Sequence, residues 1–110
     1  MVKTVILCAV GMSSSVVVKS VRKAAEKKGV EIDIHCQPGL TYRDMDYSKV
    51  DVVLLAPQLG GQAPEILDYF DAHNIEVPVE KINQLDYALA KGENVLNRIM
   101  QLYEESQAQK

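Results

Sequence analysis

The sequence predicts an α/β fold, a small three-layer doubly wound sheet of four parallel strands flanked by helices. Short β-branched, apolar runs alternate along the chain with segments of helical periodicity. This rhythm is typical of parallel sheets with helical crossovers, whose central strands are buried on both faces. The length of 110 residues fits one hydrophobic core. We therefore expect a single domain over residues 1–105 and a polar tail over 106–110.

The first half of the chain contains two expected strands around one helix. Residues 2–7 (VKTVIL) form an apolar run that is typical of a buried strand. Apolar residues then recur at helical spacing from about Ser13, and Gly29 is suited to end this helix. The apolar face of the helix consists of Val17, Val21, Ala24 and Ala25. Residues 30–36 alternate between apolar and polar side chains, which indicates an edge strand. Residues 37–49 have weak periodicity, so we expect a loop with at most a short helix.

The second half continues the same alternation. We expect a strand at 50–56, a helix that opens near Pro64, a strand at 77–82, and a C-terminal helix from Leu85 onward that is interrupted near Gly92. The run at 50–56 is the strongest strand signal and should be central. The helix after Pro64 should bury Ile66, Leu67 and Phe70. Because a proline cannot donate to a sheet ladder, Pro78 predicts an edge position for the strand that contains it.

The composition excludes several classes of function. A net charge of −3 gives no basic surface for nucleic acid. Two cysteines are too few for a disulfide-stapled secreted domain, so a cytoplasmic location is expected. No apolar run is long enough for direct membrane insertion. His35 and His73 have no second ligand at metal-binding spacing, so no metal site is expected.

The stretch CAVGMSSS, residues 8–15, lies at the expected turn from the first strand to the first helix. The N-terminus of a helix presents free backbone N–H groups and partial positive charge, both of which favour anions. Gly11 allows a sharp turn, and the hydroxyls of Ser13, Ser14 and Ser15 can cap the helix or bind an oxyanion. The same field stabilises a thiolate at Cys8 relative to the thiol. The segment therefore combines a candidate nucleophile with a candidate phosphate cradle.

The spacing excludes better-known loops. This segment lacks the GxxxxGK[ST] pattern of a nucleotide P-loop and the three glycines of a dinucleotide-binding loop. It also lacks the CxxC of a thioredoxin-like motif. A cysteine-dependent phosphatase would place an arginine six residues after its nucleophile, where this chain has Ser14. No charged residue lies between Lys3 and Lys19, so nothing nearby in the sequence would activate water. This neutrality favours a phosphoryl carrier over a hydrolase.

The chain resembles the lactose/cellobiose-type enzyme IIB component of the bacterial phosphoenolpyruvate-dependent sugar phosphotransferase system. The resemblance rests on LCAVGMSSS at 7–15, VDVVLLAPQ at 50–58 and the length of the chain. It implies a fold related to low-molecular-weight tyrosine phosphatases, with Cys8 as the phosphorylated residue. Phosphate would arrive from a histidine of the IIA component and leave to a sugar bound by the IIC permease, without a metal or organic cofactor.

The resemblance also assigns the remaining site residues. The phosphate-binding loop would consist of Ala9, Val10, Gly11, Met12, Ser13, Ser14 and Ser15. Gln58 and Tyr87 match positions near that loop. The alternative is that Gln58 only ends a strand and that Tyr87 packs on the sheet with its hydroxyl in water.

Other interpretations stay open. The main alternative is a thiol-dependent redox-sensing or binding module on a flavodoxin-like sheet, and a phosphatase is a weaker one. A redox sensor needs a resolving thiol, and alternation along residues 30–36 directs Cys36 to the core rather than to Cys8. The basic residues Lys19, Arg22 and Lys23 fit the solvated face of the first helix, with a docking role open.

Overall fold

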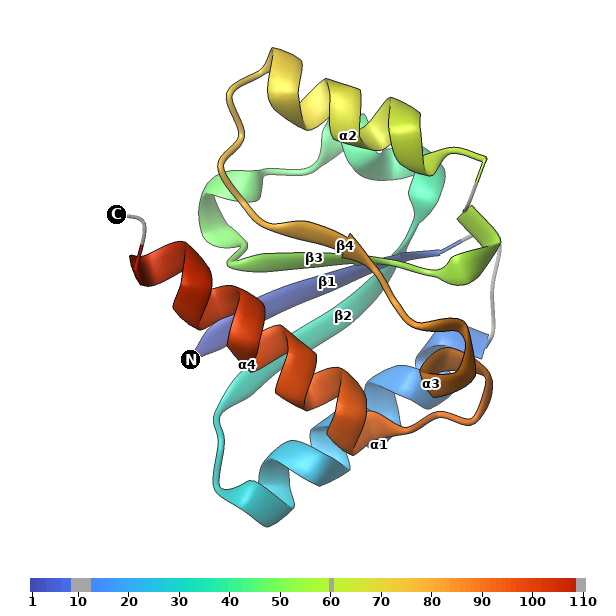
Figure 1. Cartoon of the computed structure of the whole chain (residues 1–110), viewed down its shortest axis with the longest axis vertical. Coiled ribbons are helices and arrows are strands. Elements are labelled where there is room, and N and C mark those ends of the chain that lie inside the picture. Colours follow the sequence, from blue (N-terminus) through green and yellow to red (C-terminus); the bar gives the residue numbers. More distant parts are fainter. Residues whose placement is uncertain (9–12, 60, 109–110) are drawn as a thin grey trace.

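A computed structural model describes residues 1–8, 13–59 and 61–108 of the chain. Its strands form one four-stranded parallel sheet in the order β2-β1-β3-β4 (Figure 1). The strands are β1 (Val2–Cys8), β2 (Ile32–Pro38), β3 (Val52–Leu55) and β4 (Val79–Lys81). The helices are α1 (Ser13–Lys28), α2 (Ala63–Ala72), α3 (Gln84–Ala88) and α4 (Gly92–Ala108). The predicted α/β class and the four parallel strands are confirmed.

The order of the strands places β1 and β3 in the centre and β2 and β4 at the edges, as predicted. Strand β1 pairs with β2 over its full length, from Val2 opposite Ile32 to Cys8 opposite Pro38. On its other side, β1 pairs with all of β3. All its residues but Lys3 are buried, so β1 is the axis of the sheet.

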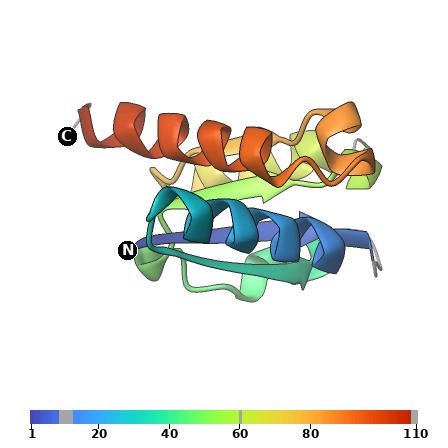
Figure 2. The same ribbon diagram turned by 90° about the horizontal axis from the view of Figure 1, so that it is seen from below.

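Helices cover both faces of the sheet and make three layers. Helices α1 and α4 lie against one face and contact each other, whereas α2 lies against the opposite face (Figures 1 and 2). Two separate apolar clusters correspond to these faces. Alternate residues of β1 enter different clusters: Ile6 and Cys8 face α1 and α4, and Val5 and Leu7 face α2. One strand therefore connects the two cores.

The predicted helices α1 and α2 are present, with one error in the packing. Gly29 follows α1 with a φ of 67°, a conformation that glycine adopts without steric cost. In α2, Ile66 and Phe70 are buried, but Leu67 is 46% exposed. The prediction that Leu67 is buried was wrong, because one residue of helix rotates the side chain by about 100° away from Ile66.

Residues 37–49 are more ordered than the sequence indicates. Strand β2 continues to Pro38, and two short 3₁₀ helices follow, η1 (Gly39–Asp44) and η2 (Tyr47–Lys49). The ring of Tyr47 packs 4.5 Å from that of Phe70, and its hydroxyl donates a 2.5 Å hydrogen bond to the carbonyl of Tyr42. The segment therefore carries part of the core beneath α2, although 3₁₀ turns this short have no readable periodicity.

The C-terminal segment differs from the expected polar tail. Helix α4 continues to Ala108, so residues 106–108 are helical rather than part of a tail. Glutamate, glutamine and alanine favour a helix, and no proline or glycine occurs there to end it.

Helix α4 begins at a tight contact with α1. The N–H of Gly92 donates to Ser20 Oγ at 3.0 Å, and Ser20 Oγ donates to the carbonyl of Ala90 at 2.6 Å. A Cβ on Gly92 would overlap the backbone carbonyl of Ser20. The predicted interruption near Gly92 is thus a point where the start of α4 lies directly against the backbone of α1.

We predict that Gly92→Ala lowers the free energy of unfolding. The collision with Ser20 should cost about 2–3 kcal/mol, which exceeds the roughly 1 kcal/mol that alanine gains over glycine in a helix. Urea denaturation measures the difference. The matched control is Gly61→Ala, whose Cβ would enter open space and should change stability by less than about 0.5 kcal/mol. Equal stability of the two variants would contradict the close approach.

We also predict that one tyrosine, Tyr47, loses its proton only at unusually high pH. Burial raises the pKa of Tyr47 to about 12. Because the folded state retains this proton more tightly, the contribution to stability is complete below the ordinary pKa of 10 and is lost as the pH rises through about 12. Tyrosinate absorbance against pH should show a late component that Tyr47→Phe removes. A late component that persists in Tyr47→Phe would contradict the assignment.

Candidate functional site

Cys8 is the last residue of the central strand β1, at the carboxyl edge of the sheet. Ligands of parallel α/β sheets bind at this edge. The neighbouring strands hold the position from both sides: Cys8 is opposite Pro38 of β2, and the N–H of Ala56 donates to the carbonyl of Leu7 at 2.8 Å. Cys8 is 5% exposed, and its Sγ lies 3.5 Å from the carbonyl oxygen of Gln37, to which the thiol donates.

Two residues that sequence reasoning missed support Cys8 from behind. A Cβ on Gly39 would lie 3.4 Å from the carbonyl oxygen of Cys8 and 2.9 Å from both δ carbons of Leu59. Leu59 ends η3 (Pro57–Leu59), the short 3₁₀ helix after β3. The segments that follow β2 and β3 therefore meet at the end of β1, where a side chain at position 39 would have to displace Leu59. The one available signal was a glycine directly after the end of an edge strand.

Helix α1 begins at the same edge, at Ser13, five residues after Cys8. Its sixteen residues supply free N–H groups and the positive end of a helix dipole. Ser15 is exposed in its first turn. Four predicted loop residues, Ala9, Val10, Gly11 and Met12, lie outside the described part of the chain, as do the side chains of Ser13 and Ser14. The structure thus describes both ends of the predicted cradle.

The two accessory residues also belong to segments at this edge. Gln58 is the middle residue of η3, and its side chain lies outside the described part of the structure. Tyr87 belongs to α3, which follows β4 at the carboxyl end of the sheet (Figure 1). Tyr87 is buried and shares the α1 and α4 core with Cys8. Its backbone N–H donates to Asn83, the residue that caps α3.

The position of Cys36 corrects one step of the redox argument. Cys36 pairs with Ile6 in the parallel register, and Cys8 lies two residues beyond Ile6. Paired residues of a parallel ladder share a face, so Cys36 faces the same side of the sheet as Cys8 and is partly buried there. The expected inward position of Cys36 is confirmed, but this position does not put the two thiols on different faces of the sheet. Strand spacing still puts their Cα atoms about 8 Å apart, which exceeds the roughly 6.8 Å limit of a disulfide.

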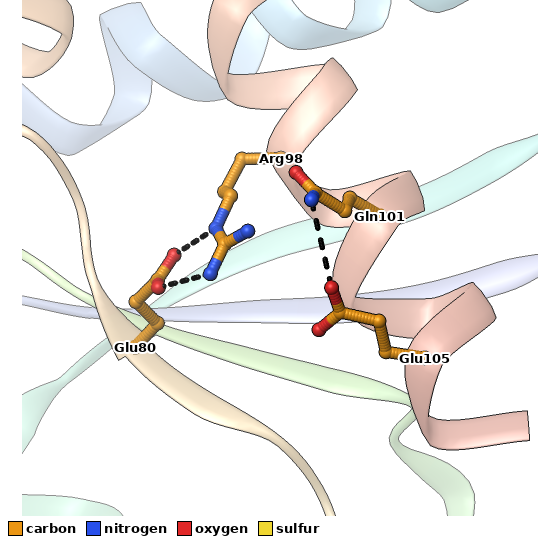
Figure 3. A network of polar contacts seen from close by, with 4 residues as sticks. All are labelled: Glu80, Arg98, Gln101 and Glu105. Carbon is orange, nitrogen blue, oxygen red and sulfur yellow. Dashed lines mark hydrogen bonds and ion pairs between the residues drawn. The ribbon is translucent and has the colours of Figure 1, made fainter. Parts of the chain in front are cut away.

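A second polar site lies between β4 and α4. Figure 3 shows Glu80 and Arg98 in a bidentate ion pair, with Nε–Oε2 and Nη2–Oε1 distances of 2.5 Å. The hydrogen bond that Arg98 donates to Glu80 raises the pKa of Arg98. The pair lines a groove of about 520 Å³, but its charges neutralise each other. We interpret it as a clamp that holds α4 on the short edge strand.

Other chemistry has little support in the described residues. Across residues 1–8, 13–59 and 61–108, no three His, Cys, Asp or Glu side chains are grouped so that they could hold a metal ion. His35 pairs with Asp33 at 2.6 Å, and His73 Nδ1 lies 2.9 Å from the carbonyl oxygen of Tyr69. Within the same ranges, no helix has the length and apolar character needed to cross a membrane.

The comparison with protein families identifies the chain. The family described as "PTS system, Lactose/Cellobiose specific IIB subunit" matches residues 3–98. The chain belongs to this family. IIB components of the phosphotransferase system (PTS) are phosphotransferases that act in sugar transport. The resemblance noted from residues 7–15 and 50–58 is therefore confirmed at the level of the family.

Curated relatives extend the same similarity over most of the chain. The oligo-beta-mannoside-specific EIIB component of Bacillus subtilis (strain 168) is 30% identical over 102 residues, which cover 93% of this chain and 96% of the relative. The galactose-specific EIIB component of Lactococcus lactis subsp. cremoris is 32% identical over 93 residues, 81% of this chain and 84% of the relative. These names cover different sugars.

Solved structures agree in fold. The cellobiose-specific phosphotransferase IIB component from Borrelia burgdorferi is 27% identical and superposes with a TM-score of 0.79, with coverage of 96% of this chain and 94% of that one. The lactose-specific IIB component domain from Streptococcus pneumoniae is 21% identical with a TM-score of 0.75, over 93% and 97%. The second likeness shows the fold alone.

We predict that Gly39 and Leu59 are coupled in stability. Gly39→Ala should lower the free energy of unfolding by about 1–2 kcal/mol, because its Cβ displaces Leu59. In a Leu59→Ala background, Gly39→Ala should lower the free energy of unfolding much less, because the δ carbons that the new Cβ would contact are absent. Denaturation of the four proteins of this double-mutant cycle gives the coupling. Strictly additive effects would contradict the convergence behind Cys8.

Proposed function

We propose that this chain is a cytoplasmic phosphocarrier that accepts a phosphoryl group on Cys8 from a phosphohistidine of a IIA component. It then passes the group to a sugar that is bound by a IIC permease. Cellobiose, lactose or a related disaccharide is the substrate class that the family description supports.

The observation that carries the proposal is the position of the Cys8 thiol. It ends a buried central strand, so its backbone is fixed, and a sixteen-residue helix begins five residues later at the same edge of the sheet. A phosphoryl group attached there would meet helix N–H groups and the positive end of the dipole. Preorganised dipoles of this kind stabilise anionic groups without rearranging during the reaction.

The transfer consists of two in-line displacements. In the first, the Cys8 thiolate attacks phosphorus, the S–P bond forms, and the P–N bond to the donor histidine breaks, which leaves imidazole that takes up a proton. In the second, a sugar hydroxyl attacks, loses its proton to a base on the acceptor side, and forms an O–P bond. The S–P bond breaks, and the thiolate is restored.

The hydrogen bond to Gln37 distinguishes the resting thiol from the reactive states. Only the protonated sulfur can donate to the carbonyl of Gln37. A thiolate or a phosphocysteine has no proton to offer and would be repelled by this oxygen. Deprotonation should therefore release Sγ from β2 and favour a rotamer directed toward the N-terminus of α1.

The alternatives have weaker support. Hydrolysis of a phosphocysteine would need a group that activates water, and residues 4–18 carry no formal charge. The Cα atoms of Cys8 and Cys36 are too far apart for a disulfide, as described above. A redox pair of these two thiols would therefore require backbone movement of β1 or β2.

The test is intact-protein mass spectrometry. The chain is incubated with phosphoenolpyruvate, the general phosphotransfer proteins and a panel of IIA proteins. We predict addition of one phosphoryl group to the wild type and none to Cys8→Ser. The matched control is Cys36→Ser, which also removes one thiol from the same face of the sheet and should be phosphorylated like the wild type.

The site assignment fails if Cys8→Ser is phosphorylated as fully as the wild type. The carrier function fails if no IIA protein phosphorylates the wild type while its thiol oxidises readily and reversibly, a result that would support the redox-sensing alternative.

A further inference from the structure

A shallow groove of about 260 Å³ lies between α1 and the edge strand β2, next to Cys8. It is lined by Ser15, Val18, Lys19, Arg22, His35, Cys36 and Gln37. Ser15 belongs to the predicted phosphate loop, and the carbonyl of Gln37 accepts the hydrogen bond from the Cys8 thiol. The groove therefore extends from the candidate site along the surface of the sheet edge.

The charge of this groove differs from that of the three other described grooves. Lys19 and Arg22 line it together with His35, and no carboxylate does. The three other described grooves all include carboxylates, among them Glu80, Glu65 and Glu26. The whole chain has a net charge of −3. An acidic protein thus presents two cations, Lys19 and Arg22, without a carboxylate in the lining, beside the candidate nucleophile Cys8.

The contacts made by the lining residues leave the positive charges of Lys19 and Arg22 available to a partner. Arg22 donates one hydrogen bond, from Nη2 to the carbonyl of Ile34 at 2.8 Å, which fixes the guanidinium against β2 without neutralising it. Asp33, which is not part of the lining, lies 2.6 Å from His35 Nε2. Lys19 is exposed.

We propose that this groove docks acidic side chains of the protein that donates the phosphoryl group. The inference rests on the proposed carrier function and names the surface by which the donor is recognised. Complementary charge speeds encounter and orients two proteins, and here it would bring the donor against Cys8. A permease is the less suitable partner, because cytoplasmic loops of membrane proteins carry an excess of Lys and Arg and would be repelled.

The test compares two charge reversals on one helix. Lys19→Glu places a carboxylate in the groove, whereas Lys27→Glu makes the same change in net charge two turns further along α1, outside the lining. With the IIA protein that phosphorylates the wild type, Lys19→Glu should raise the KM for phospho-IIA about tenfold with little change in kcat. Lys27→Glu should change KM less than twofold, and Lys19→Arg should restore wild-type kinetics.

Each outcome has a distinct meaning. A rise in KM that becomes smaller as ionic strength increases supports docking, because salt screens exposed charges. Equal effects of Lys19→Glu and Lys27→Glu overturn docking but leave the carrier function intact. A fall in kcat with unchanged KM also overturns it, because Lys19 would then act on the phosphoryl group itself. Failure of every IIA protein to phosphorylate the wild type overturns the carrier function and this inference together.

Cys36 provides an independent readout that needs no phosphoryl transfer. It is a half-buried thiol in the lining of the groove, and in a Cys8→Ser background it is the only thiol of the chain. Unphosphorylated IIA should slow its alkylation several-fold in Cys8→Ser and in Cys8→Ser with Lys27→Glu. The protection should be lost with Lys19→Glu. Protection that survives Lys19→Glu would contradict the inference.

Discussion

The burial and two-sided pairing of strand β1 is the constraint on which the rest of the structure depends. Every residue of β1 except Lys3 is buried, and hydrogen-bonded neighbours flank it on both sides. Its alternate side chains enter two separate cores, so a shift of one residue would exchange the faces of Ile6 and Leu7 and disrupt both cores. The register of β1 is therefore fixed strongly, and with it the position of Cys8. The proposed phosphoryl transfer would use a thiol that is fixed in this way.

The supports of the site come from segments that are far apart in sequence, which limits what a single sequence reveals. The strands, the edge positions of β2 and β4, and the first helix followed from apolar runs, Pro78 and Gly29. Gly39 and Leu59 could not be predicted, because their role depends on two crossovers that end at one place behind Cys8. The same holds for Gly92, whose hydrogen bond to Ser20 spans 72 residues. Local pattern predicts elements, whereas backbone approach depends on the assembled fold.

The error at Leu67 and the incomplete inference at Cys36 have related causes. Leu67 lies next to the buried Ile66, and helical periodicity at the edge of an apolar stripe does not decide which of two neighbours faces the core. Cys36 was assigned correctly to an inward position, but that assignment did not say which other inward residues share its face. The parallel register decides this, because it aligns Cys36 with Ile6 and hence with the face of Cys8. Faces of different strands can be compared only once the register is known.

The charges around Cys8 are distributed so that holding the phosphoryl group and attracting the donor protein would depend on different residues. Residues 4–18 are uncharged, so this segment would hold a phosphoryl group on Cys8 by dipoles rather than by a salt bridge to lysine or arginine. A carrier benefits from this, because a group that is bound too tightly cannot be passed on, and each 1.4 kcal/mol of extra stability would slow its release about tenfold. Attraction of a donor, in contrast, benefits from full charges. Lys19 and Arg22 supply them from the groove beside the loop, where positive charge can act on a partner's surface.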